Sequence, residues 1–207
     1  MTEKILIISP HTDDGELGCG GSIAKFIEDD ADVTYVALSC CEKSVPPEYP
    51  RDILSHEVKE ATRILGINDP ILFSFEVREF PRLRQEILDT LIRLRNKLHP
   101  TMVFTPSRFD THQDHKTTVE ETMRAFKNCT LLGYEQPWNN ISFNTLAFIP
   151  LREDHISKKI HALQCYETQK DRAYLSKDFV RGLAITRGTQ IEEKYAEAFE
   201  VIKWVIK

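Results

Sequence analysis

The sequence predicts an α/β fold in which a parallel sheet lies between layers of helices, followed by a C-terminal extension. Segments with the apolar pattern of strands alternate with helix-like segments four times, an order typical of parallel sheets with right-handed crossovers. The first segment, Lys4–Ser9, reads as a continuous apolar strand. Such strands are expected in parallel sheets because both of their faces are buried.

The remaining elements of the parallel part follow from apolar patterns and from residues that begin or end helices. Gly66 suits the position just after a helix, and Pro81 suits the first position of a long helix. The predicted strands are Lys4–Ser9, Val33–Ser39, Ile71–Phe75 and Met102–Thr105. The predicted helices are a short one at Ile23–Ile27, then Asp52–Leu65, Pro81–Leu98 and Asp114–Asn128.

The pattern changes after the fourth helix, and this part forms the predicted extension. Its expected elements are two strands and two helices, at Leu131–Tyr134, Ser142–Ile149, Glu153–Glu167 and Asp178–Arg187. The last segment, Ala196–Val205, is compatible with a helix or an extended strand.

Composition and charge exclude several classes of protein. With 207 residues and neither linker nor repeat, residues 1–207 are expected to form a single domain. The net charge of −5 without basic blocks predicts no nucleic-acid partner, and no apolar run approaches the roughly 20 residues that span a bilayer. Five cysteines without a CxxC pair indicate reduced thiols in a cytoplasmic protein. Any metal ion would therefore be held by His and carboxylate side chains.

Polar residues and glycines are concentrated in Pro10–Gly21, directly after the first predicted strand. His11, Asp13 and Asp14 come first, and a glycine-rich loop is expected before the next helix begins. In open α/β sheets, ligands bind at the carboxyl ends of the strands. These three side chains are therefore candidates for metal binding or proton transfer.

A second polar cluster, His112-Gln113-Asp114-His115, follows the fourth predicted strand. Parallel strands end at the same edge of a sheet, so folding should bring the two clusters together. They offer three histidines and three aspartates. This is enough for three zinc ligands with an open fourth position, a general base and a residue that orients a histidine.

Simpler interpretations exist for each cluster taken alone. Asp14 could cap the following helix, and a single histidine is more often an ordinary polar residue than a ligand. The glycines also suggest a dinucleotide-binding loop, with Glu42 after the second strand as a ribose contact. However, Gly18-Cys19-Gly20-Gly21 does not match GxGxxG, and a polar quartet rather than glycine follows the strand.

Both clusters resemble motifs of the LmbE-like (PIG-L) N-deacetylases. Pro10-His11-Thr12-Asp13-Asp14 resembles the PHPDDE motif of that family, and His112–His115 resembles its HPDH motif. The similarity extends over nearly the whole chain. It implies a Rossmann-like, zinc-dependent hydrolase that removes acetyl groups from N-acetylglucosamine-type sugars or sugar conjugates.

The resemblance also implies a role for each motif residue. His11, Asp14 and His115 would bind Zn²⁺ or another divalent metal, and Asp13 would be the general base for a water activated by the metal. A cationic His112 would stabilise the oxyanion, and Asp114 would orient it. Two alternatives stay open: a non-catalytic module that binds metal or nucleotide on the same fold, and hydrolysis of a different amide or acyl group.

Departures from the family motifs leave the substrate open. Thr12 and Gln113 replace motif prolines, and Thr111 occupies a position where many relatives have an arginine that contacts substrate. Three polar residues near the expected loop ends are candidates for substrate contacts or for ordinary surface positions: Arg108, Asp110 and Glu135. Because relatives often form rings, a homo-oligomer is also an expectation, with Ile141–Ile149 at an interface or in the core.

Overall fold

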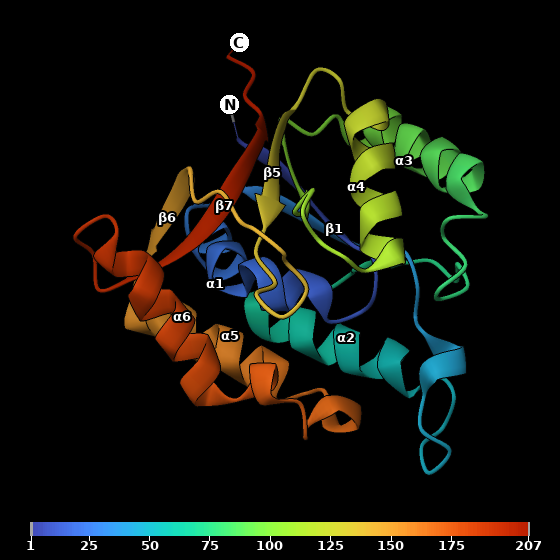
Figure 1. Cartoon of the computed structure of the whole chain (residues 1–207), viewed down its shortest axis with the longest axis horizontal. Coiled ribbons are helices and arrows are strands. Elements are labelled where there is room, and N and C mark those ends of the chain that lie inside the picture. Colours follow the sequence, from blue (N-terminus) through green and yellow to red (C-terminus); the bar gives the residue numbers. More distant parts are fainter. Residues whose placement is uncertain (1, 207) are drawn as a thin grey trace.

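The computed structural model of the chain describes residues 2–206 and contains a seven-stranded sheet with helices on both faces (Figure 1). The strands are β1 (Lys4–Ser9), β2 (Asp32–Ala37), β3 (Ile71–Leu72), β4 (Met102–Pro106), β5 (Thr130–Tyr134), β6 (Ala147–Leu151) and β7 (Tyr195–Lys203). The α-helices are α1 (Asp14–Glu28), α2 (Ile53–Leu65), α3 (Arg84–Leu98), α4 (Gln113–Ala125), α5 (Glu153–Leu163) and α6 (Lys177–Thr189). Three short 3₁₀ helices are η1 (Glu42–Ser44), η2 (Glu167–Gln169) and η3 (Ala173–Leu175).

The strand order is β3-β2-β1-β4-β5-β7-β6, and the first five of these are parallel. The chain builds outward from β1 to β2 and β3, then returns to place β4 on the other side of β1. Ligands bind in the crevice at such a reversal of strand order. This confirms the predicted α/β fold and places the ends of β1 and β4 side by side.

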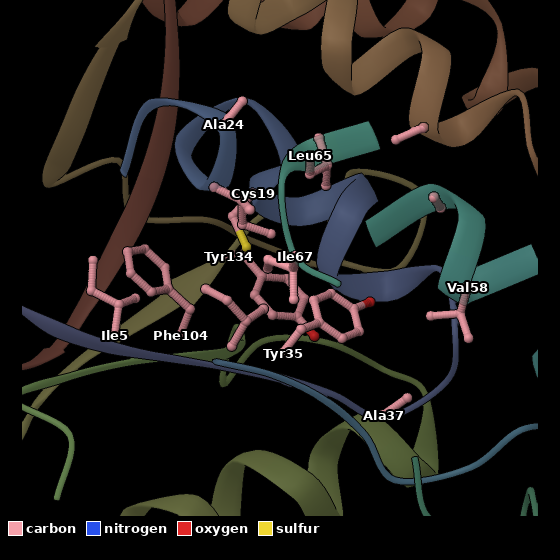
Figure 2. Packing of buried hydrophobic residues seen from close by; sticks show 14 of the residues in the cluster. Ile5, Cys19, Ala24, Tyr35, Ala37, Val58, Leu65, Ile67, Phe104 and Tyr134 are labelled. Atoms are coloured by element: carbon pink, nitrogen blue, oxygen red, sulfur yellow. The ribbon is translucent and has the colours of Figure 1, made fainter. Parts of the chain in front are cut away.

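The sheet is buried on both faces, and β1 shows how its sequence achieves this. Ile5 and Ile7 point into the cluster beneath α1 and α2, which Figure 2 shows. Leu6 and Ile8 point to the opposite face, where α3 and α4 pack. The alternation follows from the two-residue period of a strand and explains the continuous apolar run.

Helix α1 begins at Asp14, so the prediction of a glycine-rich loop was wrong. A Cβ added at Gly15 would lie 2.5 Å from the Tyr35 ring, and one at Gly18 would lie 2.3 Å from the Tyr134 ring. The glycines therefore let the helix approach buried tyrosines of the sheet. They leave no phosphate-binding loop, which removes the basis for the dinucleotide interpretation.

The C-terminal segment forms β7, an antiparallel strand inserted between β5 and β6, which settles the choice between helix and strand there. A kink at Cys19 frees backbone N–H groups in α1 from intrahelical hydrogen bonds. The buried carboxylate of Glu197 in β7 accepts hydrogen bonds from two of these groups. Gly21 N donates to Glu197 Oε1 at 3.0 Å and Ser22 N to Oε2 at 2.7 Å. The extension thus completes the sheet and stabilises the irregular helix that follows the first motif.

Some predicted boundaries were also corrected. The predicted strand at Ser142–Ile149 begins only at Ala147, and the one at Ile71–Phe75 ends at Leu72. In the part of the chain that the structure describes, no helix is long and apolar enough to cross a membrane. The five cysteines, all within the described residues, are present as thiols, and four of them are buried.

Candidate metal and catalytic site

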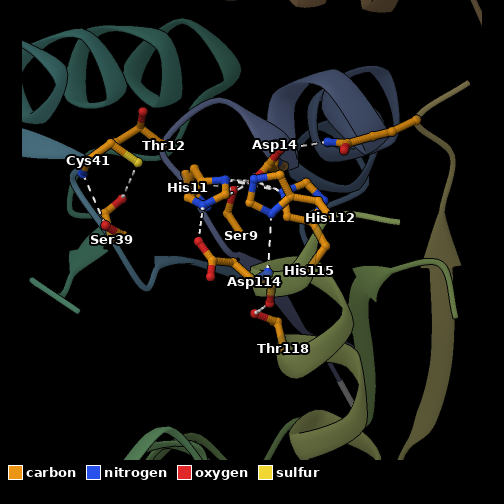
Figure 3. A network of polar contacts seen from close by, with 12 residues as sticks. Ser9, His11, Thr12, Asp14, Ser39, Cys41, His112, Asp114, His115 and Thr118 are labelled. Carbon is orange, nitrogen blue, oxygen red and sulfur yellow. Dashed lines mark hydrogen bonds and ion pairs between the residues drawn. The ribbon is translucent and has the colours of Figure 1, made fainter. Parts of the chain in front are cut away.

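The two polar clusters meet at the carboxyl edge of the sheet, where β1 and β4 are neighbours (Figure 3). His11, Asp13 and Asp14 lie between the end of β1 and the first turn of α1. His112, Asp114 and His115 lie at the start of α4, after β4. The structure therefore brings together all six residues that the sequence placed in one site.

Three donor atoms converge on one point within this site. His11 Nδ1 lies 3.1 Å from Asp14 Oδ2, and His115 Nε2 lies 3.1 Å from the same oxygen. The two ring nitrogens are 3.2 Å apart. Ligands bound tetrahedrally to zinc at 2.0–2.1 Å are about 3.3 Å from one another, so this triangle fits one divalent cation. Imidazole nitrogen and carboxylate oxygen are also ligands that such cations prefer.

Each of the three donor residues also contacts a second polar group through its other side-chain nitrogen or oxygen. His11 Nε2 lies 3.0 Å from Asp114 Oδ2, and His115 Nδ1 lies 2.8 Å from Asp110 Oδ2. Asp14 Oδ1 accepts a hydrogen bond of 2.8 Å from Gln136 Nε2. Histidines that bind metals commonly donate their other N–H to a carboxylate, which fixes the ring and its tautomer. The arrangement is therefore typical of a metal centre.

Electrostatic interactions keep the Asp14 carboxylate ionised and raise the pKa of its neighbour Asp13. Against the effect of burial, the charges of His115 and His11 hold the pKa of Asp14 well below its usual range. Burial, together with the nearby charge of Asp14, raises the pKa of Asp13 to about 6. Asp13 makes no side-chain cap on α1 and lines the cleft instead. A carboxylate in this position can accept a proton near neutral pH.

His112 differs from the expectation in both its partner and its charge. The carboxylate of Asp114 contacts His11 rather than His112, and only the backbone N–H of Asp114 donates to His112 Nδ1, at 3.2 Å. Burial, reinforced by His115 and His11, lowers the pKa of His112 to about 4. The ring is therefore neutral at pH 7, and because Nδ1 accepts, Nε2 carries the proton. His112 offers a neutral N–H donor instead of a cation.

A cleft of about 410 Å³ opens beside these residues. Asp13, His112 and His115 contribute to its lining. Trp138 and Tyr174 also line it, and they stack with ring centroids 4.1 Å apart and planes 13° apart. Ligand pockets of roughly 300–1,000 Å³ accommodate small organic molecules, so the cleft has room for a sugar.

The three polar residues considered as substrate contacts have internal partners and do not line the cleft. Asp110 supports His115, and the Arg108 guanidinium donates to Glu200 at 2.6 Å. The Glu135 carboxylate forms an ion pair with Arg187. Their contacts indicate supporting roles, and Asp110 directly contacts His115, one of the three converging donors.

Sequence reasoning missed Gln136 and considered Asp110 only as a substrate contact or a surface residue. Gln136 follows β5 and reaches Asp14 from 122 residues away, and nothing in its local sequence signals this contact. Asp110 precedes His115 by five residues, and its proximity to the second motif was the only available signal. Glu42, the residue considered for a ribose contact, does not line this cleft.

The fold and this site define a class of protein: an α/β protein in which donor atoms of two histidines and one aspartate converge at the carboxyl edge of a parallel sheet, with a further aspartate beside them. The PIG-L family model, described as GlcNAc-PI de-N-acetylase, matches residues 6–126. The match covers more than half of the chain and includes both motifs. The chain belongs to the PIG-L family, and it is an enzyme of the deacetylase class that hydrolyses carbon–nitrogen bonds.

Known proteins support this relationship. A protein of Escherichia coli K12 described as an uncharacterized deacetylase, YaiS, is 28% identical over 170 residues, covering 79% of this chain and 90% of its own length. The solved N,N'-diacetylchitobiose deacetylase of Pyrococcus horikoshii, in complex with an inhibitor, has a TM-score of 0.80 and 22% identity, covering 97% and 84% of the two chains.

The same fold also carries other chemistry. The solved 4-carboxy-2-hydroxymuconate hydratase GalB of Pseudomonas putida KT2440 has a TM-score of 0.79 and 21% identity, covering 100% of this chain and 98% of that chain. Likeness at this level of identity establishes the fold alone. The substrate and the roles of individual residues therefore have to be argued from the site.

Proposed function

We propose that this protein is a zinc-dependent hydrolase that removes an N-acetyl group from an N-acetylglucosamine-type sugar or sugar conjugate. The observation that carries the proposal is the triangle of donor atoms from His11, Asp14 and His115, with separations of 3.1–3.2 Å. Its acid–base neighbour Asp13 and the N–H donor His112 line the same cleft. Together they supply the groups that hydrolysis of an amide requires.

His11, Asp14 and His115 would hold the zinc ion. When bound, the ion polarises the amide carbonyl and lowers the pKa of a water molecule toward about 7. The supporting contacts from Asp114, Asp110 and Gln136 keep the three donors oriented toward one point, so little reorganisation is required. Another divalent metal would be held by the same atoms.

Asp13 would accept the proton of the attacking water. Its side chain lies on the cleft surface beside the donors, and burial has already raised its pKa into the range of an effective general base. The leaving nitrogen must receive a proton as the carbon–nitrogen bond breaks. Asp13 can deliver the one it has taken, so no separate acid is required.

His112 would stabilise the negative charge that develops on the carbonyl oxygen. Its Nε2–H is available because Nδ1 accepts the Asp114 backbone N–H. A neutral donor of this kind costs less to bury than a cation beside a metal ion. Loss of one such donor typically slows catalysis about 100- to 1,000-fold.

The substrate class rests on the family and on the size of the cleft. The family description names an N-acetylglucosamine-containing substrate, and the Pyrococcus horikoshii relative is named for an N-acetylated disaccharide. A cleft of about 410 Å³ suits one sugar ring with a substituent. We therefore propose an N-acetylglucosamine derivative that places one sugar ring in this cleft.

The test is acetate release from a panel of N-acetylated sugars, with zinc added and with a chelator as control. Acetate released with zinc, and lost on chelation, is the expected result. Release of a different acid would retain the metal-dependent mechanism but change the acyl group. A protein that binds zinc stoichiometrically and releases no acid from any member of the panel would instead be a non-catalytic binding module.

A further inference from the structure

Two arginine side chains line the cleft beside the proposed metal site, Arg78 between β3 and α3 and Arg172 between η2 and η3. Both residues are exposed. Within residues 2–206, neither guanidinium has a hydrogen-bond or ion-pair partner. Most arginines of the described chain do have a carboxylate partner, as Arg84 has in Glu121. The cleft therefore presents two cationic groups without internal counter-charges.

The backbone of Arg78 fixes its position next to the metal-binding residues. Its N–H donates to Asp114 Oδ2 at 2.6 Å, and this is the oxygen that contacts His11. Arg78 has a φ of 71°, in the left-handed region that favours glycine. Backbone geometry alone would therefore select glycine here, and strained residues of this kind cluster at functional sites. The presence of arginine at this position therefore points to a role for its side chain, which lines the cleft.

Arg172 lies two residues before Tyr174, and both residues line the cleft. Burial raises the pKa of Tyr174 to about 12, the charge of Asp13 acts in the same direction, and the charge of Arg172 opposes them. Arg172 and Asp13 thus act on the same hydroxyl. Tyr174 is itself fixed by stacking on Trp138. Because Arg172 and Asp13 line the same cleft, the second cation shares this cleft with the reacting groups.

The charges of the cleft favour a negatively charged ligand. The carboxylates in its lining, Asp13 and Asp14, belong to the proposed catalytic and metal-binding set. Apart from the residues of the proposed metal-binding and catalytic set, the charged side chains of the lining are Arg78 and Arg172. A planar guanidinium donates two parallel hydrogen bonds that match the oxygens of a carboxylate or a phosphate.

We infer that the substrate is an N-acetylated amino sugar that carries an anionic group, a phosphate or a carboxylate, and that Arg78 and Arg172 bind this group. The inference rests on the proposed deacetylase function and narrows its substrate class. The two arginines would set specificity by binding the part of the substrate that does not react, and so would orient the acetamide toward Asp13.

The experiment compares kcat/KM for acetate release by the zinc-loaded enzyme from three sugars. N-acetylglucosamine 1-phosphate and carboxymethyl N-acetylglucosaminide carry the two anionic groups, and methyl N-acetylglucosaminide is the neutral reference. We expect at least one anionic sugar to exceed the neutral one by about 10-fold or more, since one charge-assisted hydrogen bond is typically worth this much. Which one is preferred distinguishes phosphate from carboxylate.

Variants then assign the preference to the two side chains. Arg78→Gln and Arg172→Gln should each lower kcat/KM for the preferred anionic sugar about 10-fold and leave the neutral sugar within about twofold. Arg82→Gln is the matched control, because Arg82 is 83% exposed, pairs with Glu79 and does not line the cleft. It should change none of the three values.

Equal values for anionic and neutral sugars would overturn this inference and leave the deacetylase proposal intact, as would an anionic preference that survives both substitutions. If no sugar released acetate, the deacetylase proposal would fail, and calorimetric titration of the zinc-loaded protein with N-acetylglucosamine 1-phosphate would still decide the inference. Binding that weakens about 10-fold in each arginine variant, but not in Arg82→Gln, supports it. Binding that is unchanged in all three contradicts it.

Discussion

The carboxylate of Asp114 lies 3.0 Å from Nε2 of His11, a proposed metal ligand, and supports this histidine instead of His112. Two backbone N–H groups, of Arg78 and Phe80, donate to the same carboxylate at 2.6 and 3.3 Å. Asp114 thus joins the second motif to the first and to the loop before α3. We propose that Asp114 acts mainly on metal affinity and has a smaller effect on His112, the proposed donor to the oxyanion.

The substitution Asp114→Asn should therefore weaken zinc binding. Loss of a carboxylate behind a metal-binding histidine typically costs about 10- to 100-fold in affinity. Competition with a chromogenic chelator would measure the change. At saturating zinc, kcat should recover much of its wild-type value. Wild-type zinc affinity combined with a large loss of kcat would instead indicate that Asp114 acts through His112.

Asp13→Asn should separate metal binding from catalysis. Asp13 is not one of the three converging donors, so the variant should retain about one zinc per chain by elemental analysis. Without a general base, kcat should fall about 100- to 10,000-fold. A fully active Asp13→Asn enzyme would show that another group accepts the proton.

Gly18→Ala should destabilise the protein because the new Cβ would lie 2.3 Å from the ring of Tyr134. That ring is fully buried, and its hydroxyl donates to Ile8 O at 3.1 Å, so it has no room to move. Overpacking of this kind typically costs about 1–3 kcal/mol in the free energy of unfolding, which urea denaturation would measure.

Gly182→Ala is the matched control for this prediction. Gly182 lies in α6, is exposed, and has no atom within 4 Å of the position of an added Cβ. Alanine there should raise the free energy of unfolding by up to about 1 kcal/mol through helix propensity. Equal effects at the two positions would contradict the role of Gly18 in close packing.

Glu197→Gln should destabilise the fold by removing the counter-charge of a buried lysine. Lys159 Nζ lies 2.7 Å from Glu197 Oε1, and both side chains are almost entirely buried. Breaking a buried ion pair by removing one partner typically costs about 3–5 kcal/mol. The exposed pair of Arg63 and Glu60 is the comparison, and Glu60→Gln should cost less than about 1 kcal/mol. A loss below 1 kcal/mol for Glu197→Gln would show that Lys159 has other compensation.

The sequence allowed the site to be predicted because its signals are local. His11 and Asp14 directly follow one strand, and His112 and His115 directly follow another, so the topology of a parallel sheet was enough to bring them together. The contact between Gln136 and Asp14 spans 122 residues and depends on the placement of β5, for which the sequence carries no local signal.

The errors in the fold have the same origin. The start of α1 at Asp14 depends on tertiary contacts of Gly15 and Gly18 with tyrosines on other strands, and these contacts override the low helix propensity of glycine. Periodicity could not distinguish a helix from a strand at Ala196–Val205. The segment is extended because it pairs with β5 and β6, which are distant in the sequence. The neutral state of His112 likewise reflects burial, which follows from the packed structure.

The most direct test of zinc-dependent deacetylation at this site is a titration of metal-stripped protein with zinc, with acetate release from an N-acetylglucosamine derivative as the readout. Activity should rise linearly and level off at about one zinc per chain. His115→Ala should bind zinc far more weakly and should not recover activity at the same stoichiometry. Full acetate release by the metal-stripped protein, or by His115→Ala in the presence of a chelator, would contradict the account.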